Sequence, residues 1–371
     1  MCLDVQANPG LLSFCFGLDI ESRVARKKNQ YMGKLLLGVV AVGSFAVAFG
    51  EGKISQWISP LKHNTGCLNQ FYRDVPPVLM KQSLQNNSYA LCFNGFNVMY
   101  SGVSKTPLWS AEYLNPARLS VKLKREDSFH EETRVGNAAH RALLSDYRGS
   151  GYDRGHMAPN GDMGDLKAQH DSFSLANMVP QAPKNNQHIW RELEEATRAI
   201  VVKQKQDVYV VTGPLFEGQR LKTIGRGVIV PTAVYKAVYI PKTGAVGAYY
   251  APNNNSLQVN VVSVCYLEEK LGINLFPQLT EEQKRNVYQL PKTAAQVKPN
   301  QPLAYAHWDG ESQCAEEASS DTIAATSKQF TQQSSGSMPP SSSDGIDDDT
   351  KQALIKQLVD ALLHYFLQIL R

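Results

Sequence analysis

The sequence predicts a single domain that mixes strands and helices, with an appendage at each end. Its 371 residues exceed one average domain, and its hydrophobic content of 43% suits a globular protein with a real core. Stretches of alternating apolar residues occur among stretches with helical periodicity. We predict a targeting segment over 1–48, the globular domain over 49–314, a disordered linker over 315–350 and an amphipathic helix over 351–371.

The first predicted part has the organisation of a secretory signal peptide. Basic residues between Arg23 and Lys34 precede an apolar run over 35–50, which contains the small-residue cleavage signal AVA. Sixteen residues are few for a membrane span, and an uncleaved anchor is the alternative. A start at Met32 would make the signal conventional. We therefore expect export to the periplasm or the outside of the cell, with no stable membrane span after cleavage.

The cysteines suit an oxidising compartment. Four of the six lie beyond the signal, and an even number in an exported protein permits disulfides. Cys67 with Cys92 would staple the start of the domain, and Cys265 with Cys314 follows by elimination. No pair has CxxC spacing, which argues against a zinc site made of cysteines.

The domain itself alternates between the two periodicities. A polar loop over 119–148 separates the first strands from the rest. Pro231 marks an edge or a bulge, and Thr280 is a helix N-cap. We predict strands within 89–102 and over 106–114, 207–216 and 227–241, a helix over 188–205, a strand followed by a helix over 257–272, and a helix over 279–290.

The C-terminal parts differ in composition from the domain. Residues 315–350 are rich in Ser, Gln and Asp and have few large apolar residues, so they should not fold. Residues 351–371 carry one apolar helical stripe, which could pack on its own domain, bind a protein partner or self-associate. The domain carries a net charge of +6 and the linker −6. A basic body suits a polyanionic ligand.

The stretch GYDRGHMAP, residues 151–159, concentrates groups for phosphodiester hydrolysis. A neutral His156 can take a proton from water near neutral pH, and Arg154 can neutralise phosphate charge. In an extended segment the two side chains share one face, and Gly155 between them lets the substrate approach. A purely structural histidine explains His156 equally well at this point.

A second group of polar residues follows downstream. Asn186, Trp190 and Glu194 have i, i+4, i+8 spacing and would share one stripe of a helix that starts at Asn186. An amide oxygen and a carboxylate on one stripe can organise a hydrated Mg²⁺, which takes few protein ligands. The alternatives are a helix N-cap for Asn186 and a solvated charge for Glu194.

Taken together, these stretches resemble a known family. DYRGSGYDRGHMAP followed by SLANMVPQAPKNNQHIWRELE is similar to the DNA/RNA non-specific endonucleases, which include mitochondrial endonuclease G and secreted bacterial sugar-non-specific nucleases. The strings LWSAEYL, REDSFH, VVTGPLF and VPTAVYKAV resemble flanking blocks of that family in the same order. The similarity spans roughly Cys67 to Trp308.

The resemblance implies an α+β fold with a ββα-metal (His-Me finger) site and a central mixed or antiparallel sheet flanked by helices. It also implies roles for six residues: His156 as general base, Asn186 as the sole direct metal ligand, Glu194 holding a metal-bound water, Arg154 on phosphate, Asn177 as a supporting asparagine, and Arg125 as the further arginine.

The expected function is that of an exported endonuclease that uses Mg²⁺, or Mn²⁺ in its place, to cut DNA and RNA without marked sequence specificity. Reading phosphate and sugar rather than base edges would explain such tolerance. The alternatives are a nucleic-acid-binding relative that has lost catalysis and a phosphodiesterase for small nucleotides. No HExxH or GxSxG motif supports a protease.

Overall fold

A seven-stranded antiparallel sheet forms the centre of the computed structural model, which describes residues 66–334; the predicted segments 1–48 and 351–371 lie outside these residues. The strand order is β12-β11-β10-β7-β4-β3-β2. The strands are β2 (Ser88–Cys92), β3 (Asn97–Ser101), β4 (Thr106–Leu114), β7 (Val208–Leu215), β10 (Ala233–Ile240), β11 (Ala245–Pro252) and β12 (Asn260–Val262). This architecture confirms the predicted α+β class with a central antiparallel sheet.

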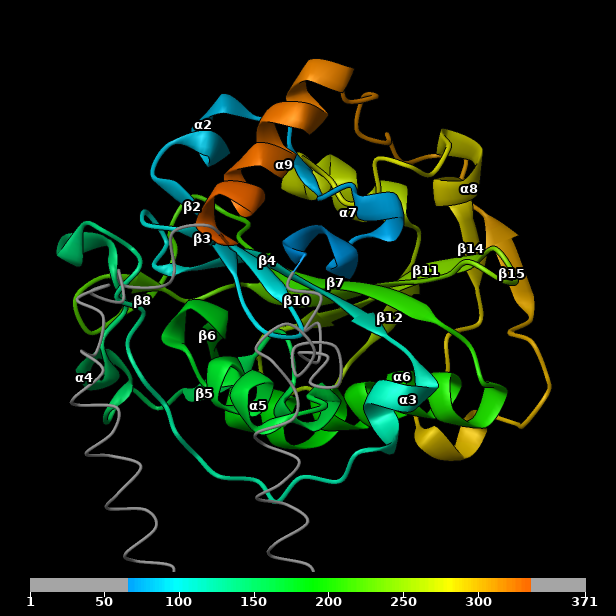
Figure 1. The fold of residues 1–371 in the computed structure, drawn as a ribbon, viewed down its shortest axis with the longest axis horizontal. Helices are drawn as coiled ribbons and strands as arrows, with labels where there is room; N and C mark the ends of the chain where they lie inside the picture. The colour runs from blue at the N-terminus through cyan, green and yellow to red at the C-terminus, as the bar shows by residue number, and fades with distance from the viewer. Residues whose placement is uncertain (1–65, 335–371) are drawn as a thin grey trace, which may run out of the picture. The chain divides into compact units, whose positions relative to one another are not determined.

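Helices cover both faces of this sheet (Figure 1). On the upper face in that view lie α7 (Val264–Leu271), α8 (Glu281–Arg285) and α9 (Ser320–Ser334). On the lower face lie α3 (Pro116–Ser120), α5 (Leu166–Ser172) and α6 (Arg191–Gln204). Two single-turn helices, α2 (Gln82–Gln85) and α4 (Leu144–Tyr147), complete the set of α-helices within residues 66–334.

Four two-stranded ribbons surround the sheet, and the one formed by β5 and β6 lies on the lower face (Figure 1). They pair β1 (Val78–Leu79) with β13 (Ile273–Asn274), β5 (Asp153–His156) with β6 (Met178–Gln181), β8 (Thr223–Ile224) with β9 (Val228–Ile229), and β14 (Asn286–Tyr288) with β15 (Tyr305–Trp308). A six-residue π-helix, η7 (Asn185–Trp190), runs directly into α6. The short 3₁₀ segments are η2 (Cys67–Gln70), η3 (Tyr72–Asp74), η4 (Ala138–His140), η5 (Asn160–Asp162), η6 (Leu175–Asn177) and η8 (Ala294–Gln296).

Strand alternation gives the sheet two different cores. In β10, Tyr235 and Tyr239 join a cluster with Leu267 of α7, whereas Val234 joins a cluster with Leu193 of α6. Successive strand residues point to opposite faces, so every residue of β10 is buried by one layer of helices or the other. The lower layer carries the polar segments singled out in the sequence.

Most predicted elements are present, and two differ in extent. The predicted strand 106–114 coincides with β4, and the predicted helix 188–205 forms α6 with part of η7. The predicted strand 227–241 is broken at Pro231, which has no N–H for a ladder, so β9 and β10 belong to different sheets. The predicted helix 279–290 begins after its N-cap Thr280 but ends at Arg285, where β14 starts.

Both predicted disulfides are present. Cys67 bonds to Cys92 and Cys265 bonds to Cys314. The first joins η2 to the edge strand β2, and the second joins α7 to the chain that leads to α9. Within residues 66–334, no helix is both long enough and apolar enough to cross a membrane.

The boundary predicted at residue 314 needs correction. Residues 315–350 were expected to be a linker without structure, yet Ser320–Ser334 form α9 on the upper face of the sheet. The reason is one aromatic residue: Phe330 is fully buried, with its ring 5.3 Å from that of Phe71 and 5.7 Å from that of Trp109. Burial of one large apolar side chain contributes about 1.5–3 kcal/mol, which favours packing of this otherwise polar segment on the core.

We expect Phe330→Ala to lower the free energy of unfolding of the full chain by about 3–5 kcal/mol, the usual loss for a buried phenylalanine. Urea titration followed by circular dichroism would measure it. The matched control is Lys328→Ala, an exposed position on the same helix, which should change stability by less than about 0.5 kcal/mol. Equal effects of the two substitutions would show that α9 contributes nothing to the core.

Candidate active site

The DRGH motif forms strand β5, which pairs with β6 so that His156 lies opposite Met178 and Asp153 opposite Gln181. In sequence η5, α5 and η6 lie between the two strands, and after β6 the chain turns into η7 and α6. The β5–β6 ribbon is called the hairpin below. Gly155 is buried, and an added Cβ would collide with the side chain of Gln181. The glycine is therefore required by packing within the hairpin, which corrects the expectation that it gives room to a substrate.

Asn177 fastens this hairpin to the sheet. Its side-chain amide donates to the backbone oxygens of Ala158 (2.8 Å) and Ser172 (2.9 Å). Its Oδ1 accepts from the amide of Ala158 and from the hydroxyl of Ser110, both at 2.9 Å. Asn177 is fully buried, and its hydrogen-bonding groups are all used within the protein. It does not line the cleft but holds the chain after β5 against the sheet.

His156 lies at the end of β5 between two aromatic rings. The centroids of Phe173 and Phe129 are 5.1 Å and 5.7 Å from that of the imidazole. Burial, helped by the positive charges of Arg125 and Arg154 and opposed by Asp127, lowers the pKa of His156 to about 3. The ring is therefore neutral at physiological pH. Its Nε2 is buried and has no hydrogen-bond partner among the described residues, so a lone pair or an N–H remains available.

Asn186 lies in the π-helix η7, with its amide held in a defined orientation. Its Nδ2 donates to Oδ2 of Asp153 at 2.9 Å, and Gln187 donates to the same oxygen at 2.8 Å. Because the nitrogen is the donor, the amide oxygen is left as an acceptor. The helix starts one residue earlier, at Asn185, and Asn186 does not act as its N-cap. π-helical turns commonly occur at functional sites.

Glu194 lies one turn into α6 and lines the same cavity as Asn186. Burial raises the pKa of Glu194 to about 7, and the nearby positive charges of Lys236 and Arg198 oppose the rise. Trp190, expected on the same stripe, is instead buried in the core of the lower layer. The wider turn of the π-helix changes the angular spacing that a regular α-helix would give.

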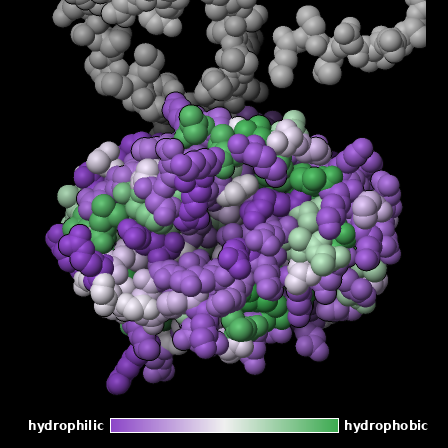
Figure 2. Space-filling view, turned by 90° about the horizontal axis from the view of Figure 1, so that it is seen from below, coloured by the Kyte–Doolittle hydropathy of each residue, from purple (hydrophilic) through white to green (hydrophobic). Residues whose placement is uncertain are grey.

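These side chains line one cleft of about 1060 Å³ on the lower face of the molecule. Figure 2 shows that face from below: it is mostly hydrophilic and is hollowed near its centre. Arg154 lies 4.0 Å from the ring centroid of Phe129, and Arg125 pairs with Asp127 at 2.7 Å. The charged residues of the lining are Arg125, Arg148, Arg154, Arg191 and Arg198 with Asp127, Asp153, Glu194 and Glu195.

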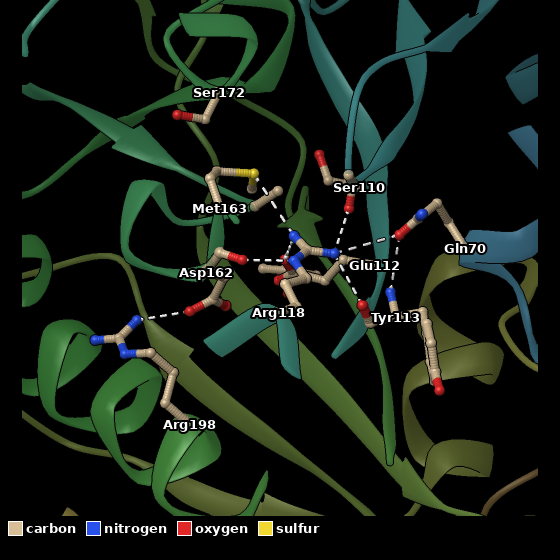
Figure 3. A network of polar contacts seen from close by, with 12 residues as sticks. Gln70, Ser110, Glu112, Tyr113, Arg118, Asp162, Met163, Ser172 and Arg198 are labelled. Carbon is tan, nitrogen blue, oxygen red and sulfur yellow. Dashed lines mark hydrogen bonds and ion pairs between the residues drawn. The ribbon is translucent and has the colours of Figure 1, made fainter. Parts of the chain in front are cut away.

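A buried network of charges that the sequence analysis missed supports one side of this cleft (Figure 3). Arg198 donates to Asp162 at 2.7 Å, and the backbone oxygen of Asp162 accepts from Nε of Arg118 at 2.5 Å. Burial would lower the pKa of Arg198, but the charges of Asp162 and Glu194 raise it. Spacing could have revealed Arg198, because it follows Glu194 by four residues on the same helix face.

The sheet supplies the inner end of that network. Arg118 approaches Glu112 of β4 at 3.4 Å, and it also donates to the backbone oxygen of Gly95 at 2.6 Å. Burial raises the pKa of Glu112 well above its usual range, and the negative charge of Asp162 adds to the rise. The charges of Arg118 and Lys236 oppose that rise, so the carboxyl of Glu112 is held between burial and its cationic neighbours.

The structure thus brings five of the six predicted residues to one cleft: His156, Arg154, Arg125, Asn186 and Glu194. The sixth, Asn177, lies under it. Among residues 66–334 there is no group of three or more His, Cys, Asp or Glu side chains placed to hold a metal. The donor set at this site is instead one amide oxygen and one carboxylate, which suits a cation that keeps most of its water.

Comparison with known proteins agrees with this geometry. The profile of the family described as DNA/RNA non-specific endonuclease matches residues 76–282. The chain is 36% identical over 208 residues to the mitochondrial nuclease EXOG of Danio rerio and 36% identical over 189 residues to the mitochondrial endonuclease G of Homo sapiens. It is 32% identical over 255 residues to a nuclease of Nostoc sp..

These alignments cover 50%, 47% and 64% of this chain, respectively. They cover 60%, 61% and 90% of the relatives, so the chain spans about three fifths of the length of the first two. Among solved structures, a chain of the EndoG/EndoGI complex is similar, with 26% identity and a TM-score of 0.47. That match covers 53% of this chain and 89% of the solved one.

The environment of His156 generates one prediction about its charge. In the metal-free full-length chain, the ring carbon shifts of His156 should keep neutral-imidazole values from pH 8 down to pH 5, because burial and two arginines oppose protonation. NMR titration would follow the resonance, assigned by its absence in a His156→Gln variant. A titration midpoint near the ordinary value of about 6.5 would contradict the buried, neutral ring.

Proposed function

Because the chain belongs to the DNA/RNA non-specific endonuclease family, we propose that it is a metal-dependent endonuclease that hydrolyses phosphodiester bonds of DNA and RNA with little sequence selectivity. One observation carries the proposal most: His156, a neutral imidazole whose Nε2 has no hydrogen-bond partner among the described residues, lines the same arginine-rich cleft as Asn186. A nucleophile-activating base and charge stabilisation for phosphate are the two requirements of this hydrolysis.

His156 is assigned as the general base. A neutral imidazole can accept the proton of a water molecule that attacks the phosphorus. In the free protein, the arginines and burial make the ring a weak base. A phosphate in the cleft offsets the charges of Arg125 and Arg154, so its arrival raises the proton affinity of the ring. The substrate therefore makes the base stronger at the moment when it is needed.

Asn186 and Glu194 are the residues assigned to hold the metal. The oxygen of the Asn186 amide would ligate it directly, and the carboxylate of Glu194 would hold one of its waters. When bound, Mg²⁺ or Mn²⁺ would supply positive charge at the phosphate and at the leaving oxygen. Asp153 acts on Asn186, fixing by its hydrogen bond which end of the amide points away from it.

The arginines of the cleft are assigned to phosphate binding. Arg154 follows Asp153 on β5, Arg125 lies on the polar segment beside Phe173, and Arg198 is held by Asp162. One guanidinium group can donate to two oxygens of the same phosphate, and such a contact does not distinguish one base from another. Contacts of this kind account for a nuclease that accepts both DNA and RNA.

Export remains part of the proposal. Cys67–Cys92 and Cys265–Cys314 are disulfides in the structure, and such bonds persist in oxidising compartments. Together with the signal-like segment before residue 50, they favour a protein that acts in the periplasm or outside the cell.

We expect His156→Ala to lower the rate of plasmid and RNA digestion by about 10²–10⁴-fold, the usual contribution of a general base. The variant should keep the parental circular dichroism spectrum and Tm. Digestion would be followed on gels with Mg²⁺ and with EDTA.

Digestion at the parental rate by the variant would refute the role of His156. A parental chain that binds nucleic acid but never cuts it would instead be an inactive relative. Cleavage of dinucleotides in preference to plasmid would favour a small-nucleotide phosphodiesterase.

We expect Asp153→Ala to weaken Mn²⁺ binding by about 10–100-fold, because the amide of Asn186 loses the partner that orients it. Isothermal titration calorimetry of the full chain would measure the dissociation constant, and excess metal should restore nuclease activity. The control is Asp127→Ala, which also removes a carboxylate from the cleft but contacts Arg125 rather than Asn186. An equal loss in both variants would mean that charge, and not orientation of the amide, explains the effect.

A further inference from the structure

A second, smaller cavity of about 350 Å³ opens beside the cleft and shares part of its wall. We call it the side groove. Asn160, Gly161, Glu195 and Arg198 line both cavities, so the two meet along these residues. The side groove then continues between α6 and the segment that follows α3. Its own lining includes Val121, Lys122, Val202 and Lys203.

We propose that the side groove is a binding site for the polynucleotide on one side of the cleaved bond, a few nucleotides beyond the cleft. The proposal rests on the proposed nuclease function, and it names where a long substrate goes after it leaves the catalytic residues. Three features of the groove support a nucleic acid as its occupant: its geometry, its junction with the cleft, and its charge.

The geometry matches the direction and length of a strand. One face of α6 runs along both cavities, from Glu194 in the cleft to Val202 in the groove. Eight residues of α-helix extend about 12 Å. Along a duplex this distance equals roughly three to four nucleotide steps of 3.4 Å. A substrate held at His156 therefore reaches the groove only if it extends several nucleotides past the cleaved bond.

The junction is open and offers a free hydrogen-bond donor. Gly161 is exposed and has no side chain to separate the cavities; an added Cβ would come within 2.9 Å of Nη1 of Arg198. Nδ2 of Asn160 is buried and has no hydrogen-bond partner among the described residues. An amide nitrogen is a donor only, so the group that satisfies it must be an acceptor, as a phosphate oxygen is.

The groove joins positive charge to exposed aliphatic surface. Lys122, Lys203 and Arg198 line the groove with one acid, Glu195. Nζ of Lys203 donates to the backbone oxygens of Ala294 and Val297, and Arg198 pairs with Asp162, so Lys122 is the cation on which the inference relies. Val121 and Val202 are 43% and 50% exposed. Lysines suit the backbone of a polyanion, and aliphatic side chains suit its sugars. No aromatic residue lines the groove, so bases do not stack there. The site should therefore add affinity without adding sequence preference.

The test compares a short substrate with a long one in the full-length chain. Val202→Glu and Lys122→Glu place negative charge in the groove, away from the catalytic residues. We expect each to lower kcat/KM on a 16-nucleotide DNA strand by about five- to tenfold while leaving kcat/KM on a tetranucleotide unchanged. Lys122→Glu should also reduce the salt dependence of binding to the 16-mer by about one phosphate contact.

Matched controls separate this effect from general charge. Val103→Glu alters a valine that is 56% exposed, and Lys328→Glu alters an exposed lysine of α9; neither residue lines the cleft or the groove. Both should act like the parent on both substrates. Unchanged cleavage of the 16-mer by the groove variants would overturn the inference and leave the nuclease function standing. Equal losses on both substrates would also overturn it, because the groove would then not be separate from the cleft. A parent that cuts neither substrate would refute the function itself.

Discussion

The site depends on the four hydrogen bonds of one buried amide. Asn177 joins the sheet at Ser110, the chain after β5 at Ala158 and the end of α5 at Ser172. Each bond contributes modestly on its own, about 0.5–1.5 kcal/mol, but leaving its buried partners unsatisfied costs about 1–3 kcal/mol each. The amide therefore fixes the distance between the hairpin that carries His156 and the sheet beneath it.

Burial then prepares the charges of the cleft for a polyanion. The ring of His156 stays neutral because it is enclosed by Phe129 and Phe173 near two arginines, and the carboxyl of Glu194 is less acidic than usual because it is buried. Burial thus keeps the imidazole neutral to a lower pH, and the carboxyl protonated to a higher pH, than solvent would. Positive charge remains in excess at the cleft, so binding of a phosphate relieves electrostatic repulsion as well as making contacts.

The sequence was informative where local pattern decides structure. The alternation in β4 and the disulfide pairs could be predicted from periodicity and cysteine number. The DRGH motif and the helix spacing pointed to four of the five residues that line the cleft, and the resemblance to the endonuclease family added Arg125. The packing requirement for glycine at position 155 could not be predicted, because it is imposed by the side chain of Gln181 on the neighbouring strand. Nor could the π-helical turn, which shifts Trp190 into the core, or the network behind Arg198, which joins elements far apart in sequence.

The helix at Ser320–Ser334 could not be predicted because its composition indicates disorder. Burial of Phe330 in the core nevertheless favours the folded helix. That burial bears on biosynthesis. Translation proceeds from the N-terminus, and the lower layer, whose core extends to Leu303, is complete in sequence before Phe330 is made. The upper core, in which Phe330 meets Phe71 and Trp109, can close only after almost the whole described chain has left the ribosome. The upper face of the sheet is therefore covered last, and Phe71 and Trp109 lack their contact with Phe330 until then.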